Sequence, residues 1–176
     1  MGTHVMIDLE TFGTNPDTAF ISIGAVKFNP MNGQIAEDTF YKRIDWEDAL
    51  KHGTITASTL AWWMQQSKEA RDEILKPGER LDLVLTELKQ YLGSKPIVWG
   101  NGASFDISIL EHHYRASDIP VPWAFWDIRD VRTVVDLAAG IVSKADVPQP
   151  KVAHNALHDA MYQAAYVSKM WQALRK

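Results

Sequence analysis

The stretch Val5-Met6-Ile7-Asp8-Leu9-Glu10 begins as a short apolar strand and ends in two carboxylates. Residues two apart in a strand project from the same face, so Asp8 and Glu10 point the same way. Their Cα atoms should lie roughly 7 Å apart, at ~3.3 Å per residue. Carboxylates so placed can converge on two divalent metals ~3.5 to 4 Å apart, as in two-metal phosphoryl-transfer sites. Taken alone, this D-x-E pattern is more often an exposed pair at a strand end.

Two further strands follow the first. Residues 20–28, Phe-Ile-Ser-Ile-Gly-Ala-Val-Lys-Phe, are rich in the β-branched and aromatic side chains that favour strands. The cluster Asn-Pro-Met-Asn-Gly at residues 29–33 predicts a turn, and residues 35–43 predict a third strand. Because the connection is short, we expect the second and third strands to pair as an antiparallel hairpin.

Helix and strand signals alternate along the rest of the chain. Residues 57–91 carry apolar side chains at helical spacing, and Pro77-Gly78 separates two of these helices. Residues 96–100 predict a buried strand, and residues 125–130 predict a buried strand that enters a helix. Further helices are expected at about residues 104–115, 130–139 and 156–176. This order predicts an α/β protein with a mixed five-stranded sheet flanked by helices.

Composition limits the class of protein. A chain of 176 residues with 46% hydrophobic content can form one compact domain, residues 1–176, with a substantial core. No stretch approaches the ~18 to 20 apolar residues of a membrane helix, and no signal peptide is recognisable at the N-terminus. The absence of cysteine excludes disulfides and thiolate metal sites. We therefore expect a soluble cytoplasmic protein without a membrane partner.

A third acid follows the predicted strand at residues 96–100. It is the last residue of Asn101-Gly102-Ala103-Ser104-Phe105-Asp106. Gly102 suits a tight strand-to-helix turn, and Ser104 suits an N-cap. Asp106 would then lie in the first helical turn. The alternative is an acid that only complements the helix dipole.

The fourth acid lies near the end of the chain, in His154-Asn-Ala-Leu-His-Asp159. Asn155 can cap the last helix, which places Asp159 in its first turns and His154 in the preceding loop. A ligand on a helix beside a general base on a loop suits a metal site. A lone loop histidine is more commonly just solvent-exposed. His158 is a competing base, but it points about 100° away from Asp159 around the helix.

Charge and ligand chemistry bear on the kind of metal and partner. The formal net charge is −4, and it becomes zero if Asp8, Glu10, Asp106 and Asp159 are counted as metal ligands. Hard oxygen ligands select magnesium or manganese over zinc. The charge balance is compatible with action on short or single-stranded nucleic-acid ends, and it argues against tight wrapping of long duplex.

In order and spacing, these motifs resemble the DEDD superfamily of 3′-to-5′ exonucleases, which includes polymerase proofreading domains, oligoribonuclease and ribonuclease T. A histidine five residues before the last acid is similar to the histidine branch, because the tyrosine branch needs Tyr at position 155, which is Asn. The chain looks most similar to stand-alone bacterial and phage exoribonuclease-like proteins. That closer resemblance rests on Ser22-Ile23-Gly24, Leu60-Ala61-Trp62-Trp63-Met64, Asn101-Gly102-Ala103-Ser104-Phe105-Asp106 and Phe125-Trp126-Asp127-Ile128-Arg129-Asp130.

The resemblance implies a ribonuclease-H-like fold and a metal-dependent 3′-5′ exonuclease. The expected substrates are single-stranded 3′ ends, with RNA favoured over DNA, and the products are nucleoside 5′-monophosphates. Two magnesium or manganese ions would be held by Asp8, Glu10, Asp106 and Asp159. The catalytic residues implied are His154, which would take a proton from the attacking water, and Glu10.

Aromatic residues are candidates for substrate contact. Adjacent helical positions cannot both face a core, so we expect Trp63 to be buried, by its helical spacing with Leu60 and Met64, and Trp62 to be exposed, where it could stack on a base. Both tryptophans could instead be shared between the core and a subunit contact. Seven tryptophans in a small domain also favour a homodimer. The resemblance adds five residues at the substrate end: Leu9, Thr11, Phe12, Asn101 and Phe105.

Two matters stay open at the level of the sequence. Asp127, Arg129, Asp130 and Arg132 could form an ion-pair network, with contact of Arg129 or Arg132 to phosphate as the minority alternative.

Two other functions compete with an exonuclease, namely a catalytically silent nucleic-acid-binding module of the same fold and a metal-dependent phosphatase of small molecules. The paired acids and His154 count against silence, because a binding module does not need them.

Overall fold

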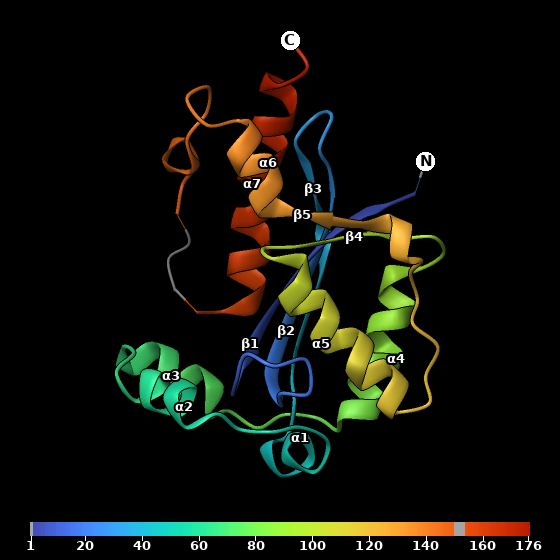
Figure 1. Ribbon diagram of the computed structural model, residues 1–176, viewed down its shortest axis with the longest axis vertical. Coiled ribbons are helices and arrows are strands. Elements are labelled where there is room, and N and C mark those ends of the chain that lie inside the picture. The colour runs from blue at the N-terminus through green and yellow to red at the C-terminus, as the bar shows by residue number, and fades with distance from the viewer. Residues whose placement is uncertain (1, 150–153) are drawn as a thin grey trace.

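The computed structural model describes residues 2–149 and 154–176, which form a mixed five-stranded sheet with helices on both faces (Figure 1). The strand order is β3-β2-β1-β4-β5. β1 pairs antiparallel with β2, as does β2 with β3, whereas β1, β4 and β5 run parallel. The predicted mixed sheet and hairpin are thus confirmed. The strands are β1 (His4–Thr11), β2 (Phe20–Asn29), β3 (Gln34–Arg43), β4 (Ile97–Gly100) and β5 (Ile128–Asp130).

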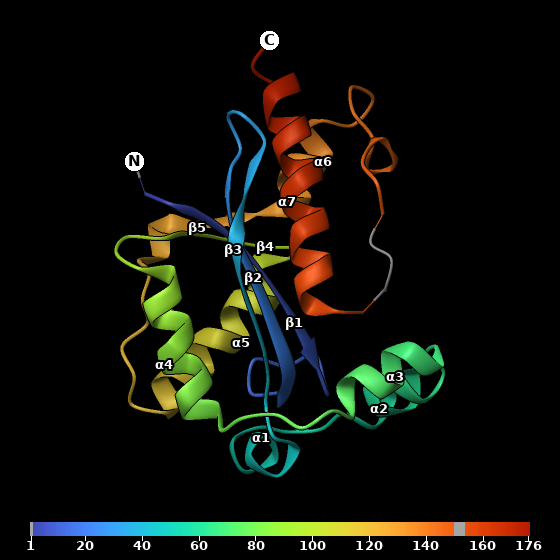
Figure 2. The ribbon, with the colours of Figure 1, turned by 180° about the vertical axis from the view of Figure 1, so that it is seen from behind.

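Helices cover the sheet on two sides (Figures 1 and 2). α7 lies on one face with α6 beside it, and α4 and α5 lie on the other. The short helices α1, α2 and α3 lie beyond one end of the sheet, at the bottom of Figure 1. The helices are α1 (Trp46–His52), α2 (Ala57–Met64), α3 (Lys68–Ile74), α4 (Leu81–Leu92), α5 (Ala103–Ala116), α6 (Val131–Leu137) and α7 (Ala156–Ala173), with 3-10 turns η1 (Phe125–Asp127) and η2 (Lys144–Asp146).

The alternation of side chains in β1 decides which face carries the acids. Val5, Ile7 and Leu9 are buried in the cluster that includes residues of α4 and α5. Met6 is buried in the other cluster, with residues of α6 and α7. Because the period of a strand is two residues, Asp8 and Glu10 continue the Met6 face and lie on the side of α7.

Gly24 allows α7 to begin directly on the sheet. It pairs with Asp8 across the ladder between β1 and β2. A Cβ at this position would lie 2.2 Å from backbone atoms of Ala156 and Leu157, which no real contact allows. The missing side chain therefore lets the first turn of α7 approach the backbone opposite Asp8.

Two local predictions are wrong. α5 begins one residue before Ser104, with Gly102 as its N-cap at φ +100°, a conformation that glycine adopts without strain. Residues 125–130 are not a buried strand, because the first half is η1, in which Phe125 and Trp126 are 79% and 65% exposed. The reason is that β5 is a three-residue edge strand with one neighbour, so the aromatic run before it has no second layer to enter.

The helical spacing around Trp63 gave the correct helix but an incorrect core face. Trp63 is buried, whereas Leu60 and Met64 are exposed. α2 lies beyond the end of the sheet rather than on a face, so that only one of its large side chains reaches the main core. Among residues 2–149 and 154–176, no helix combines the length and apolarity needed to cross a bilayer.

Candidate active site

Three acids meet where β1 ends and α7 begins. One carboxylate oxygen from each of Asp8, Glu10 and Asp159 lies within 4.8 Å of the others. Asn155 accepts a hydrogen bond from the N–H of His158 at 3.1 Å, which confirms it as the cap of α7 and fixes Asp159 in the first turn. The three acids therefore form one group of oxygen donors of the kind that binds a divalent cation.

Asp106 lies beside this group, against the backbone of the strand end. It lies in the first turn of α5, is buried, and accepts the N–H of Leu9 at 3.2 Å through Oδ1. The structure thus brings together all four acids that the sequence singled out, with Asp106 near enough for its charge to raise the pKa of Asp8.

Electrostatic repulsion makes this site unfavourable for bare carboxylates. Burial raises the pKa of Asp8 well above its usual value, and the charges of Asp106, Glu10 and Asp159 raise it further. Burial raises the pKa of Glu10 to about 8, again with help from neighbouring acids. Burial also raises the pKa of Asp106 to about 7, although the N–H of Leu9 lowers it. Crowded acids with raised pKa values are the condition that a bound cation relieves.

The surrounding cations do not neutralise the acids directly. Within the part of the chain that the structure describes, none of the four acids makes an ion pair within 4.0 Å. Oxygen donors without an ion-pair partner, converging from three elements, fit a hard divalent metal. The acidic cluster is therefore suited to metal binding.

Gln163 is a member of the site that the sequence reasoning missed. Its Nε2 donates to Oδ1 of Asp8 at 2.7 Å, and its Oε1 is buried without a hydrogen-bond partner among the described residues. The position was open to prediction, because Gln163 follows Asp159 by four residues and so lies on the same helical face. Gln163 therefore orients the carboxylate of Asp8 within the cluster.

A cavity of about 380 Å³ opens over the acids. His154 lines it, with φ +59°, a left-handed conformation that His adopts more readily than most residues. Its ring makes T-shaped contacts with the rings of Trp62 and Trp63, with centroid distances of 4.9 and 6.1 Å. The cavity is lined by Asp8, Leu9, Glu10, Asn101, Lys144, His154, Asp159, Tyr162, Gln163 and Tyr166.

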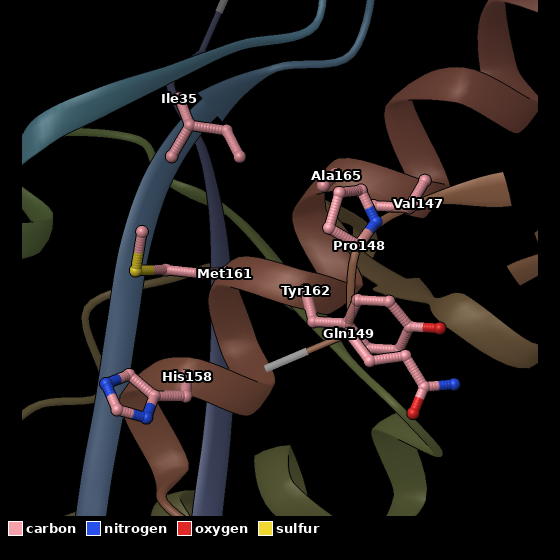
Figure 3. A pocket seen from close by; sticks show the side chains of 8 residues that line it. All are labelled: Ile35, Val147, Pro148, Gln149, His158, Met161, Tyr162 and Ala165. Atoms are coloured by element: carbon pink, nitrogen blue, oxygen red, sulfur yellow. The ribbon is translucent and has the colours of Figure 1, made fainter. Parts of the chain in front are cut away.

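His158 faces a different space. It lines a separate, largely apolar cavity of about 390 Å³ together with Met161 and Ile35, as Figure 3 shows. Its Nδ1 is buried without a hydrogen-bond partner among the described residues. Of the two candidate bases, His154 is therefore the one whose ring shares a cavity with the acids.

The tryptophan pair is arranged as expected. Trp63 is 2% exposed and donates from Nε1 to the carbonyl oxygen of Thr11 at 2.9 Å. Trp62 is 41% exposed, with its ring against Trp63 and His154. An exposed indole therefore stands beside the cavity that holds the acids.

The other predicted substrate contacts divide into two groups. Leu9 and Asn101 line the cavity. Phe12 is only 1% exposed and packs edge-on against Trp46, and Phe105 packs against the same core. Thr11 is buried, and its hydroxyl donates to the carbonyl oxygen of Gly13 at 2.7 Å. These last three side chains therefore do not line the cavity, contrary to the prediction.

The predicted ion-pair network is wrong. Among the described residues, Asp127, Arg129, Asp130 and Arg132 make no ion pair within 4.0 Å. Asp130 instead caps helices, accepting the N–H of Ala103 at 2.6 Å and that of Thr133 at 3.0 Å. Arg129 donates to backbone carbonyls of its own segment. Asp130 and Arg129 therefore bond to backbone groups rather than to each other.

The fold and the site agree with the resemblance seen in the sequence. A mixed sheet of this order, acids from β1, α5 and α7, and a histidine just before the last acid are the arrangement that the resemblance to the DEDD exonucleases implied. Residues 3–171 match the Rv2179c-like 3′-5′ exoribonuclease domain, and the chain belongs to that family.

Individual relatives agree with this placement. An exodeoxyribonuclease of Enterobacteria phage T4 is 28% identical over 188 residues, which cover 88% of this chain and 82% of the relative. The nuclease domain of 3′hExo bound to rAMP has a similar fold, with a TM-score of 0.62, 16% identity, and coverage of 97% of this chain and 92% of that one. E. coli exonuclease I in complex with a dT13 oligonucleotide gives a TM-score of 0.72 at 15% identity. That comparison covers 98% of this chain but 42% of exonuclease I.

Proposed function

We propose that this exonuclease removes nucleoside 5′-monophosphates from the 3′ ends of single-stranded nucleic acid, with RNA favoured over DNA. The observation that carries the proposal is the meeting of Asp8, Glu10 and Asp159 within 4.8 Å in a cavity that His154 also lines. The description of the family as exoribonucleases supports RNA, and the phage relative named as an exodeoxyribonuclease makes DNA the substrate to compare.

The four acids would hold two magnesium or manganese ions. Asp8, Glu10 and Asp159 offer oxygens in the cavity, and Asp106 lies beside them, bonded to the backbone of Leu9. When bound, such ions lower the pKa of water and stabilise the charge of the phosphate in the transition state. Glu10 then contributes to catalysis through the position of its carboxylate, and Gln163 keeps the Asp8 carboxylate in place.

His154 would act as the general base. Its imidazole lines the same cavity as the acids and lies against two indole rings, which restrict its orientation. A histidine so placed can accept a proton from a water molecule that attacks the terminal phosphodiester. The position of His154 just before the cap of α7 couples the base to the helix that carries Asp159.

A single assay tests the proposal against its competitors. Single-stranded RNA and DNA of one sequence, labelled at the 5′ end, are incubated with the protein and magnesium or manganese. We expect a ladder that shortens from the 3′ end, faster for RNA, with nucleoside 5′-monophosphates as products. Binding without shortening would instead indicate a silent binding module. Inertness toward both strands with cleavage of small phosphoesters would indicate a phosphatase.

Trp62 is proposed to stack on the terminal base. Trp62→Ala should weaken binding of a short single strand by ~1 to 3 kcal/mol, similarly for all four bases, because every base has a π-face. Trp62→Phe should keep most of the affinity, since it retains an aromatic face. Single-turnover titrations with short strands measure both effects.

Trp63 is the matched comparison for the same helix. Trp63→Ala should lower the free energy of unfolding by roughly 3 to 5 kcal/mol, because it removes a buried aromatic side chain. Thermal melts of the Trp62 and Trp63 variants separate stacking from folding. A Trp62→Ala variant that melts early but binds normally would end the stacking proposal.

Homodimerisation stays a prediction, and the structure offers a surface for it. Phe125 and Trp126 are exposed next to each other, with ring centroids 4.7 Å apart, beside the edge strand β5. We expect light scattering at micromolar concentration to give twice the mass of one chain, and Trp126→Ser to shift it toward the monomer. A monomeric mass for the unchanged chain contradicts the prediction.

A further inference from the structure

Lys144 is a cation at the edge of the acidic cavity. It lines the same space as Asp8 and Asp159, and its Nζ lies 5.2 Å from the ring centroid of Tyr166. Its backbone is fixed, because its carbonyl oxygen accepts the hydroxyl of Tyr162 at 3.0 Å and a capping box of Ser143 and Asp146 surrounds it. The chain therefore holds this ammonium group near the acids without pairing it to one of them.

Arg132 is a second cation on the same side. It lies in the first turn of α6, and its guanidinium atoms are 3.2 to 3.4 Å from the place that a Cβ of Gly102 would occupy. Gly102 follows Asn101, which lines the cavity. The charge of Arg132 also lowers the pKa of Asp106, against the burial that raises it to about 7. Arg132 thus lies close to the start of α5 and to its acid.

Neither cation has a carboxylate partner in the part of the chain that the structure describes. Lys144 and Arg132 are absent from its ion pairs within 4.0 Å. Arg132, on α6, also stands apart from the aromatic end of the site. α2, which carries Trp62, lies below the start of α7, whereas α6 lies beside the upper part of α7 in both views (Figures 1 and 2).

We propose that Lys144 and Arg132 bind the backbone phosphates on the 5′ side of the scissile linkage. The substrate then runs across the acids with its 3′-terminal base at Trp62 and its upstream phosphates at the two cations. This inference rests on the proposed function, because it assigns a direction to the strand in the proposed site. Phosphate oxygens are natural partners for an ammonium and a guanidinium group.

A binding experiment tests the contacts without relying on turnover. In an Asp8→Asn background, which is expected not to cleave, a 5′-fluorescent single strand of eight nucleotides is titrated at several salt concentrations with magnesium present. The logarithm of the association constant falls as the logarithm of the salt concentration rises. Each lost phosphate contact should make this slope less steep by about 0.7, so Lys144→Met with Arg132→Met should make it less steep by about 1.4. Lys89→Met, on α4 on the other face of the sheet (Figure 1), controls for the loss of a positive charge away from the site and should leave the slope unchanged.

A second experiment locates the phosphates. Strands carry uncharged methylphosphonates either at the second and third linkages from the 3′ end or at the sixth and seventh. In the unaltered protein, which cleaves, neutral linkages at the second and third positions should lower kcat/KM by roughly tenfold or more. In the cleaving protein that carries Lys144→Met with Arg132→Met, the contacts are already lost, so the same neutral linkages should cause no further loss. Changes at the sixth and seventh linkages should matter little in either protein.

The outcomes separate this inference from the proposed function. An unchanged salt slope in the double variant, or an equal loss from methylphosphonates in both proteins, would overturn the assignment of the two cations. Failure of the unaltered protein to shorten any strand would refute the exonuclease proposal instead, and the salt slope would still decide the contacts. Thermal melts of the double variant check its fold, where we expect a decrease of no more than about 2 to 4 °C from the lost contact of Lys144 with Tyr166.

Discussion

Asp8→Asn and Asp106→Asn are each expected to reduce turnover by roughly 1,000-fold or more, because the site loses a carboxylate that would hold a metal. Asn keeps the acceptor that receives the N–H of Leu9 at position 106 and the amide of Gln163 at position 8. The loss would therefore reflect charge rather than broken hydrogen bonds. Initial rates on labelled RNA across a magnesium titration measure it. Alanine at Asp8, Glu10, Asp106 or Asp159 should be equally inactive.

The same substitutions should make the metal-free protein more stable at alkaline pH. The pKa of Glu10 is raised to about 8 and that of Asp106 to about 7, mainly by burial, whereas unfolded carboxyls titrate near pH 4. The folded chain therefore keeps protons that the unfolded chain releases, and its stability falls as the pH rises from about 4 to about 8. Asp106→Asn should show a smaller fall. Melts in chelator at pH 5 and pH 8 test the sign.

Magnesium and a surface acid provide the controls. Added magnesium should raise the melting temperature of the unaltered protein by mass action, and should raise that of the four acid variants much less. Asp118→Asn is a matched control, because Asp118 is exposed and has φ +54°, which Asn tolerates well. It should change neither rate nor magnesium response. Wild-type activity in any of the four variants at the site would refute the assignment of that acid.

His154→Ala is expected to lose roughly 100- to 10,000-fold in rate, the range for a general base, with metal binding largely kept. Because His154 has a left-handed backbone, alanine there also adds strain. His154→Asn removes the imidazole but suits that conformation, so it should lose the same factor without loss of stability. Rates at saturating magnesium, with magnesium-dependent melts, separate the base from the backbone.

His158→Ala is the control for that prediction. His158 faces the apolar cavity beside Met161, so its loss should affect the rate far less. If the His158 variant showed the large loss and the His154 variants did not, the base would have been assigned to the wrong histidine.

The elements that place the acids could be predicted from the sequence, because each has a strong local cause. β1 alternates between two buried faces, so the direction of Asp8 and Glu10 follows from its period of two. Asn155 caps α7 through its own side chain, which fixes Asp159 within one turn. In both cases neighbours in the sequence determine the geometry.

The errors arise where distant contacts decide. Ser104 has the chemistry of a cap, but the turn after β4 needs a left-handed residue at 102, and the helix begins there. Phe125 and Trp126 look like core residues, but their exposure depends on the edge position of β5. Lys144 lines the cavity of the acids only because of how residues 138–149 fold. No local pattern contains that information.

The origin of the acids in three distant parts of the chain has a mechanical consequence. Asp8 touches Gln163, 155 positions away, and Leu9 touches Asp106, 97 positions away. An ion held by these acids would tie the first strand to the last helix and so close very long loops, as a disulfide does. In a chain without cysteine, this would be a reversible crosslink that forms only when metal is available. The same ion that serves hydrolysis would then also fasten the two ends of the fold together.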